Sequence, residues 1–225
     1  MVVLSLGGSI VSPDDVDASF LGDFRKLLTG YIDESGEKFV IVTGGGAPAR
    51  RYQAAFRNIV ADGSDEDQDW IGIAATRLNA ALVQAVFGRY CRDPVVTDPT
   101  EPSAITGMVL VGSGWKPGFS TDYDAVVLAK RLGARLIVNL SNTDGIYDAD
   151  PRNNPDAKPI DHLSWAELQN LVGTEWIPGR NVPFDPVATK AAAELGAPLI
   201  AAGGRDLPNL RNILLGNEFR GTLVD

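Results

Sequence analysis

Short apolar runs recur along the chain, and most of them end in glycine or in small polar residues. Runs of this length are too short for helices and are typical of strands buried on both faces. The sequence therefore predicts strands at residues 2–6, 38–43, 107–111, 136–140, 197–202 and 221–224, with a further short strand or extended segment at 94–97.

Between these runs, apolar residues recur at helical spacing. The pattern predicts helices at residues 20–31, 49–59, 70–87, 123–132 and 207–215. Ser164 and Glu167 form a capping box that predicts a short helix, and Asp185 followed by Pro186 predicts the start of a helix that ends at Gly196. The acidic run at 62–69 is predicted to be a solvated loop.

Alternation of strands and helices predicts an α/β fold, a three-layer αβα sandwich around a mostly parallel sheet. Ligands of such sheets bind at the carboxyl ends of the strands. No linker separates independent domains, so one domain is expected over residues 1–225. The sequence leaves two alternatives for a boundary between lobes, at 97–102 or just before Arg135.

Composition excludes several classes of protein. The net charge is −9 and the sequence has no run of basic residues longer than a pair such as Arg50-Arg51, which argues against nucleic-acid binding. A single cysteine, Cys91, and a single histidine, His162, exclude a cysteine metal cluster and a histidine pair, and His162 is interpreted as structural. Without an uninterrupted run of about 18 apolar residues or a signal peptide, a cytoplasmic protein is expected.

Three predicted strands run into glycine-rich loops. Gly7-Gly8-Ser9 follows the first, Gly44 to Gly46 the second, and residues 112–122 the run at 107–111. Glycines let backbone amides approach a phosphate closely, although a tight turn also explains the first pair. Ser120 or Thr121 is either a helix cap or part of an anion site, and Arg50 either a solvated residue or a phosphate contact.

The strand at 136–140 is followed by a polar stretch, Ser141 to Gly145, and then by Tyr147, which offers a flat face for a base. Asp148, Asp150 and Pro151 end regular structure there. Asp69, at the end of the acidic run, is interpreted either as a plain N-cap or as an acceptor for a hydroxyl group.

Together these residues resemble the amino acid kinase superfamily, most closely the archaeal-type uridylate (UMP) kinases. The similarity spans nearly the whole chain in order. It consists of LGGSI at 6–10, GGGxxARRY at 44–52, DxIGIxxTRLNA at 69–80, PGxSTD at 117–122, NTDGIYxADP at 142–151, DPxAxK at 185–190 and GT at 221–222.

The resemblance implies transfer of the ATP γ-phosphate to UMP, with Mg²⁺ bound through the ATP phosphates and no metal site formed by the protein. It places the UMP lobe at about 1–134 and the ATP lobe at about 135–225. Implied ATP-side residues are Ser5, Leu6, Gly7, Gly8, Ser9, Gly46, Arg50, Ser141, Asn142, Tyr147 and Asp150. Implied UMP-side residues are Gly45, Asp69, Trp115, Lys116, Pro117, Gly118, Phe119, Ser120 and Thr121. Implied catalytic residues are Lys190, Asp185 and Gly8.

Two lysines of the family pattern are missing. Ser5 stands where many members have a lysine before the first glycine pair, and Ala47 where archaeal-type members have one after the glycine triplet. Lys190, Arg50 and Lys116 remain, and Arg180 in the unusual segment 178–184 is a possible substitute. Phosphoryl transfer between phosphates needs alignment and charge cancellation rather than a general base.

The principal hypothesis is a UMP kinase, homo-oligomeric like its relatives, whose common form is a hexamer built as a trimer of dimers. The alternatives are a kinase of another small phosphate or carboxylate, and a non-catalytic nucleotide-binding or storage member of the fold. The missing lysines favour the last of these.

Overall fold

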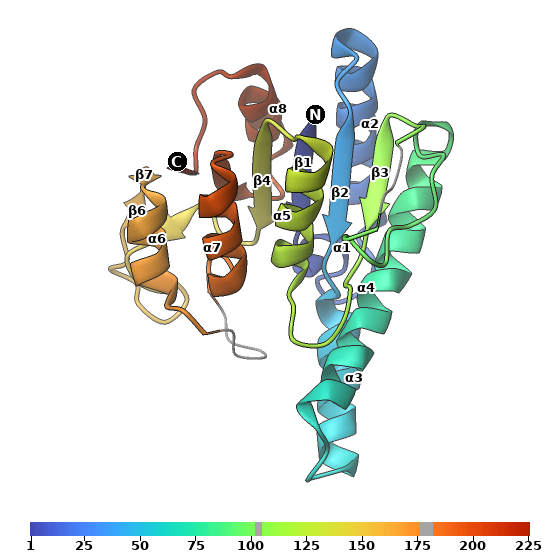
Figure 1. Cartoon of the computed structure of the whole chain (residues 1–225), viewed down its shortest axis with the longest axis vertical. Coiled ribbons are helices and arrows are strands. Elements are labelled where there is room, and N and C mark those ends of the chain that lie inside the picture. The colour runs from blue at the N-terminus through green and yellow to red at the C-terminus, as the bar shows by residue number, and fades with distance from the viewer. Residues whose placement is uncertain (102–104, 176–181) are drawn as a thin grey trace.

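The computed structural model describes residues 1–101, 105–175 and 182–225, and over these residues a seven-stranded sheet forms the centre (Figure 1). Its strand order is β3-β2-β1-β4-β8-β9-β7. The strands are β1 (Val2–Leu6), β2 (Phe39–Thr43), β3 (Val109–Gly112), β4 (Leu136–Ser141), β7 (His162–Leu163), β8 (Leu199–Gly203) and β9 (Thr222–Val224). Strands β3, β2, β1, β4 and β8 are parallel, and β9 is antiparallel to β8. The predicted mostly parallel sheet is confirmed.

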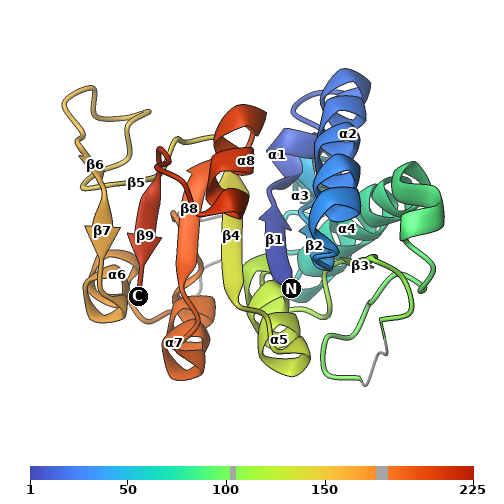
Figure 2. The same ribbon diagram turned by 90° about the horizontal axis from the view of Figure 1, so that it is seen from above.

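Helices cover both faces of the sheet, as the view along its edge shows (Figure 2). They are α1 (Gly8–Val11), α2 (Ala18–Ser35), α3 (Gly46–Ile59), α4 (Asp65–Phe87), the 3₁₀ turn η1 (Gly88–Tyr90), α5 (Thr121–Leu132), α6 (Trp165–Val172), α7 (Pro186–Leu195) and α8 (Leu207–Leu215). Helices α2, α4 and α8 lie on one side, and α5, α6 and α7 on the other. The αβα sandwich is confirmed.

Alternation along the central strand divides the core into two. Val2, Leu4 and Leu6 pack with residues of α2, α4 and α8, whereas Val3 packs with residues of α5, α6 and α7. Helices on both faces of the sheet exclude water from β1, which explains why that strand is apolar on both faces. Each core cluster includes residues from both sides of position 135, so the two predicted lobes share one sheet and both core clusters.

Helix ends follow the predicted chemistry. The Ser120 side chain accepts a hydrogen bond from the Tyr123 amide, Ser164 and Glu167 form the full capping box, and the Asp185 side chain accepts from the first amides of α7. Gly133 ends α5 in the left-handed region, which glycine adopts without a steric penalty.

The start of α4 was predicted wrongly. Residues 65–69 are helical rather than part of a loop, and Ser64 is the N-cap. Three acidic residues in the first turn, Asp65 to Asp67, favour the helix because they lie at the positive end of its dipole. Asp69 is therefore in the second turn, and the interpretation of Asp69 as an N-cap is wrong.

Two other segments differ from expectation. Residues 94–97 contribute only an isolated bridge between Val96 and Gly112. The polar stretch after β4 contains a small antiparallel pair, β5 (Ile146–Tyr147) and β6 (Pro159–Ile160), which the sequence pattern did not indicate. Strands of two residues are too short to show alternation.

Helices α3 and α4 extend together beyond the sheet (Figure 1). By length and composition alone, residues 65–90 are apolar enough to cross a membrane. In this fold Ile73, Ala80, Val83 and Phe87 of that segment are buried against the rest of the domain, although only 33% of its most apolar stretch is buried.

The turns after β1 and β2 touch each other through bare backbone. A Cβ atom at Gly44 would lie 2.5 Å from the Gly8 amide nitrogen, and one at Gly8 would overlap the Gly46 amide nitrogen. Gly46 also has a positive φ of 66°. These glycines therefore have a structural reason, which is the close approach of one loop to the other.

We predict that Gly8→Ala lowers the free energy of unfolding by at least about 3 kcal/mol, since backbone on the opposite loop cannot yield as a flexible side chain can. Gly22→Ala is the matched control, because Gly22 is exposed in the middle of α2 with no atom within 4 Å of an added Cβ. That change should stabilise the protein by about 0.5–1 kcal/mol. Urea denaturation of both variants tests the contrast, and equal effects would contradict it.

Candidate functional site

Five loops gather at the carboxyl edge of the parallel strands. They are residues 7–9 after β1, 44–46 after β2, 113–120 after β3, 142–145 after β4 and 204–206 after β8. Helices α5 and α7 each precede a parallel strand and run antiparallel to it, so their amino ends lie at the same edge. The edge thus collects backbone amides and helix amino ends, which favour anions.

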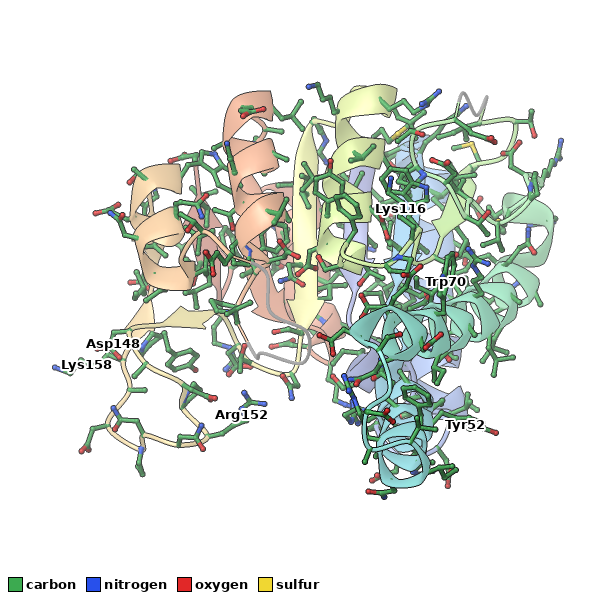
Figure 3. All side chains as sticks on the ribbon, turned by 60° about the horizontal axis from the view of Figure 1, so that its bottom comes forward. Tyr52, Trp70, Lys116, Asp148, Arg152 and Lys158 are labelled. Atoms are coloured by element: carbon green, nitrogen blue, oxygen red, sulfur yellow. The ribbon has the colours of Figure 1, made fainter. Side chains whose placement is uncertain are left out.

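The two expected half-sites lie on opposite sides of this edge. Lys116 and Trp70 mark the β3 side, whereas Arg152 and Asp148 mark the hairpin beyond β4 (Figure 3). The touching glycine loops after β1 and β2 lie between them in the strand order. A site for two ligands with their reacting ends at the centre is therefore possible.

Helix α4 fixes the glycine loop after β2 and the long loop after β3. The Asn79 side chain donates a hydrogen bond from Nδ2 to the Gly44 carbonyl at 2.8 Å. Thr76 Oγ1 accepts one from the Gly114 amide at 2.8 Å. The sequence motif around Thr76 and Asn79 is thus a scaffold for two loops of the site.

Asp69 contacts the expected UMP loop. Its Oδ2 accepts a hydrogen bond from the Gly118 amide at 2.9 Å, and its other oxygen remains available for a hydroxyl group. Burial raises the pKa of Asp69 above its ordinary value, although the hydrogen bond from Gly118 opposes the shift. Of the two interpretations left open for Asp69, the acceptor role fits this geometry.

Aromatic side chains line the loop after β3. The ring centroids of Trp115 and Phe119 are 5.2 Å apart, and those of Phe119 and Tyr123 are 4.7 Å apart. Lys116 Nζ lies 3.8 Å from the centre of the Trp115 ring, in a cation–π arrangement. Ser120 is the N-cap of α5, and the amino end of that helix faces the candidate site.

Carboxylates at the amino ends of α5 and α7 form the most unusual part of the site. Ser5 Oγ donates a hydrogen bond to Asp122 Oδ1 at 2.9 Å. Burial, together with the charge of Asp185, raises the pKa of Asp122 to about 6. The serine that replaces a family lysine therefore faces a carboxylate.

Asp124 is more deeply buried, with an exposed fraction of 1%. Its Oδ2 accepts a hydrogen bond from the Trp115 amide at 3.1 Å, and its Oδ1 has no partner in the part of the chain that the structure describes. Burial, with the charges of Asp122 and Asp185, raises the pKa of Asp124 to about 8. Asp124 is consequently protonated at neutral pH.

The residues expected on the ATP side come together. Ser141, Asn142, Tyr147 and Asp150 line one cavity of about 300 Å³ at the carboxyl end of β4. Both oxygens of Asp150 are bound by Arg152, which donates from Nε at 3.0 Å and from Nη2 at 2.8 Å. This pairing holds the pKa of Asp150 below its ordinary value, so Asp150 is charged and already oriented.

Other expected residues lie less favourably. Leu6 is fully buried, so only its backbone can serve a ligand. Arg50 is exposed and donates to the Pro13 carbonyl at 3.0 Å. Asp185 uses its Oδ1 to cap α7, while its Oδ2 is buried without a partner among the described residues.

Lys190 is exposed on α7, one turn beyond its amino end. Gly7, Gly45 and Pro117 lie in the loops described above, Ser9 lies in α1, and Thr121 is the first residue of α5. Arg180 and most of the segment 178–184 lie outside the described residues.

Sequence reasoning missed Asp122, Asp124, Arg77 and Arg152 as site residues. Asp122 and Arg77 stand inside motifs that were recognised, so the signal was present but was assigned to neighbouring residues. Arg152 could not be found, because its pairing with Asp150 depends on the turn that follows the strand.

Comparisons with known proteins agree with this geometry. A sequence model described as the amino acid kinase family matches residues 1–201. The uridylate kinase of Methanospirillum hungatei JF-1 is 42% identical over 226 residues, covering 99% of this chain and 94% of that protein. The uridylate kinase of Methanocorpusculum labreanum is 38% identical, with 99% and 94% covered.

Solved structures agree as well. The crystal structure of uridylate kinase from Archaeoglobus fulgidus has a TM-score of 0.85 at 31% identity, with 100% of this chain and 99% of that chain covered. UMP kinase from Bacillus anthracis has a TM-score of 0.80 at 22% identity, with 100% and 95% covered, which bears on the fold alone.

Stability should depend on pH through Asp124. Its pKa is raised from 3.8 to about 8, so between these values the folded protein holds a proton that the unfolded chain releases, and stability falls as pH rises. Asp124→Asn removes this dependence, because the amide cannot ionise. The variant's stability relative to the wild type should therefore rise by on the order of 1 kcal/mol per pH unit.

Urea denaturation at pH 6.5 and pH 8.0 isolates this effect, since Asp122, with a pKa of about 6, has largely finished titrating below that interval. A constant difference between variant and wild type across the interval would show that Asp124 is already ionised in the folded protein.

Proposed function

The chain belongs to the amino acid kinase family, and we propose that it is a uridylate kinase, which transfers the γ-phosphate of ATP to UMP and releases UDP and ADP. The observation that carries the proposal is the arrangement of two half-sites on opposite sides of the touching glycine loops. Relatives named uridylate kinase align with nearly the whole chain, which supports the choice of UMP.

On the ATP side, we assign the nucleoside to the cavity after β4. Tyr147 offers an aromatic face there, and Asn142 offers both a donor and an acceptor. Asp150 is ionised and oriented, and each of its oxygens already accepts two hydrogen bonds, from the Arg152 amide and Nε at Oδ1 and from Arg152 Nη2 and Asn153 Nδ2 at Oδ2. A ribose hydroxyl would therefore have to displace one of these donors to reach the carboxylate.

The phosphates would lie over the loops after β1 and β2. At the amino end of α3, Ala47 already donates to the Ser12 carbonyl and Pro48 has no N–H, so the Gly46 amide is the donor that this helix would offer a phosphate. The amides of Gly8 and Ser9 would add to it at the centre of the edge. Phosphoryl transfer needs the reacting oxygens in line and the growing charge offset, which preorganised amides supply without moving.

On the acceptor side, we assign UMP to the loop after β3 and to Asp69. The free Asp69 oxygen is suited to a ribose hydroxyl, and the aromatic side chains of Trp115 and Phe119 are suited to the base. Backbone groups of residues 115–121 would pair with the uracil edge and reject bases with a different pattern.

Mg²⁺ would be held by the ATP phosphates and water. In the described part of the chain, no three carboxylate, histidine or cysteine side chains gather around one possible metal position. Magnesium commonly keeps several waters and binds substrate phosphates, so the residues present fit this arrangement. When bound, the ion would offset the charge of the β- and γ-phosphates.

We further propose that the protein is a cytoplasmic homo-oligomer. Tyr52 and Ile59 on α3, with Trp70 and Leu78 on α4, expose apolar side chains on the helices that extend beyond the sheet. An exposed apolar surface of this kind is suited to a second copy of the chain. The molar mass of the protein in solution decides between oligomer and monomer.

The alternatives are distinguished by one assay. Purified protein with ATP and Mg²⁺ is offered UMP, CMP, AMP and GMP, and then isopentenyl phosphate and small carboxylates, with ADP release coupled to NADH oxidation. A kcat/KM for UMP that exceeds the others by at least about tenfold is expected. Comparable values for AMP or GMP, or preference for a non-nucleotide acceptor, would exclude the proposed substrate. Binding of ATP and UMP without turnover would favour a non-catalytic member of the fold.

Lys190→Met should lower kcat by about 10²–10³-fold with little change in the KM for UMP. The family lysines at positions 5 and 47 are absent here, so Lys190 should carry the main protein charge that acts on the transferred phosphoryl group. Lys130→Met is the matched control, because Lys130 is an exposed lysine in the last turn of α5, at the opposite edge of the sheet.

Steady-state kinetics with saturating ATP tests this assignment. If Lys190→Met keeps nearly full kcat while Arg180→Ala loses it, the assignment to Lys190 is wrong.

A further inference from the structure

Both backbone polar groups of Trp115 are held by side chains, which come from two different helices. Its amide donates to Asp124 of α5 at 3.1 Å, and its carbonyl accepts from Nη2 of Arg77 of α4 at 3.3 Å. Loops are normally bound less completely, because their backbone groups face water. The two peptide groups that flank the Trp115 Cα are therefore each held by a side chain.

Arg77 belongs to a set of three contacts from α4. Asp69, Thr76 and Arg77 all contact the backbone of the loop after β3, at Gly118, Gly114 and Trp115 respectively. The spacings of seven and eight residues from Asp69 place these side chains on one face of the helix. Helix α4 thus holds the loop near its start, at Gly114 and Trp115, and again at Gly118, and Arg77 is the only cation among these three side chains.

Nothing else in the described part of the chain accounts for this arginine. Arg77 is half-buried, its Nε is buried without a hydrogen-bond partner, and no carboxylate there forms an ion pair with it. Its guanidinium lies 6.0 Å from the centre of the Trp70 ring, at the limit of a cation–π contact. A buried donor without a partner destabilises the fold, so this position calls for an explanation.

We propose that Arg77 is a positioning residue of the acceptor site, which acts through Trp115. By holding the Trp115 carbonyl, it keeps residues 114–118 in the conformation that receives the nucleoside monophosphate. The inference rests on the proposed function for the identity of the ligand, but not for the geometry of the loop.

A positioning role for Arg77 predicts an effect on the binding of UMP but not on the phosphoryl-transfer step. Arg77 contacts the loop after β3 and not the glycine loops or the cavity after β4. Loss of its hydrogen bond should therefore weaken binding of UMP, because part of the binding energy would be spent on ordering the loop. The phosphoryl-transfer step and the binding of ATP should be unchanged once UMP is bound.

The kinetic experiment compares Arg77→Met, Arg77→Lys and Arg25→Met. Methionine keeps the apolar length of the side chain and removes the donors, whereas lysine keeps the charge and one donor direction. Arg25 is the matched control, because its Nε also donates to a backbone carbonyl, that of Val86 at 2.7 Å, but Val86 lies in α4 and not in the loop after β3.

Arg77→Met is expected to raise the KM for UMP by about tenfold, with kcat and the KM for ATP within about twofold of the wild type. Arg77→Lys should recover part of the loss, and Arg25→Met should leave the KM for UMP unchanged. A fall in kcat at unchanged KM, or an equal rise in both KM values, would overturn the proposal.

Hydrogen exchange of the substrate-free protein supplies a measurement that does not depend on the reaction. In Arg77→Met the amides of residues 114–118 should exchange faster than in the wild type, with the rest of α4 unchanged. Unchanged exchange of this segment would refute the positioning role even if the protein phosphorylates UMP. Faster exchange in a protein that does not phosphorylate UMP would leave the role of Arg77 in place and remove only the proposed ligand.

Discussion

The contact between the turns after β1 and β2 is the constraint on which the site depends. Gly8 and Gly44 approach so closely that neither position has room for a Cβ, and Gly46 is held in a left-handed conformation against the same loop. Because the turns meet, the amino ends of α1 and α3 point at one place rather than two. A run of glycines that looks like a ligand loop is therefore required first by the protein itself, and the bare amides that result are what a phosphate can use.

Features that depend on neighbouring residues could be predicted from the sequence. The apolar strands, the capping box at Ser164 and the cap at Asp185 are local signals, and each appears in the fold. The prediction for the start of α4 failed because acidic residues suit both a solvated loop and the first turn of a helix, and only packing decides between the two. The β5–β6 pair was not predicted because two-residue strands have no recognisable sequence pattern and are defined only by their pairing.

In the candidate site, too, local features could be predicted from the sequence and contacts between distant segments could not. Motif spacing identified the loops, and the structure brings Ser141, Asn142, Tyr147 and Asp150 around one cavity. What no local signal carries is the pairing of segments far apart in the chain, such as Ser5 with Asp122. A serine in place of a lysine is simply a missing charge in the sequence, whereas in the fold it is a neutral donor to a carboxylate.

That substitution changes the electrostatics of the whole edge. Asp122, Asp124 and Asp185 would place up to three negative charges beside a site for polyphosphates, and in the described part of the chain no cation forms an ion pair with any of them. Burial reduces this negative charge, because it raises the pKa of Asp124 to about 8 and that of Asp122 to about 6. Asp124 is then neutral at neutral pH and can hold the Trp115 amide without repelling phosphate.

Amide donors carry only partial charges, so they would offset the remaining carboxylate charge only in part. Under the proposed function, the rest would be offset by ions that accompany the nucleotide and by the few cations at the edge, and the rate of transfer would then depend more on Lys190 than the binding of the substrates does.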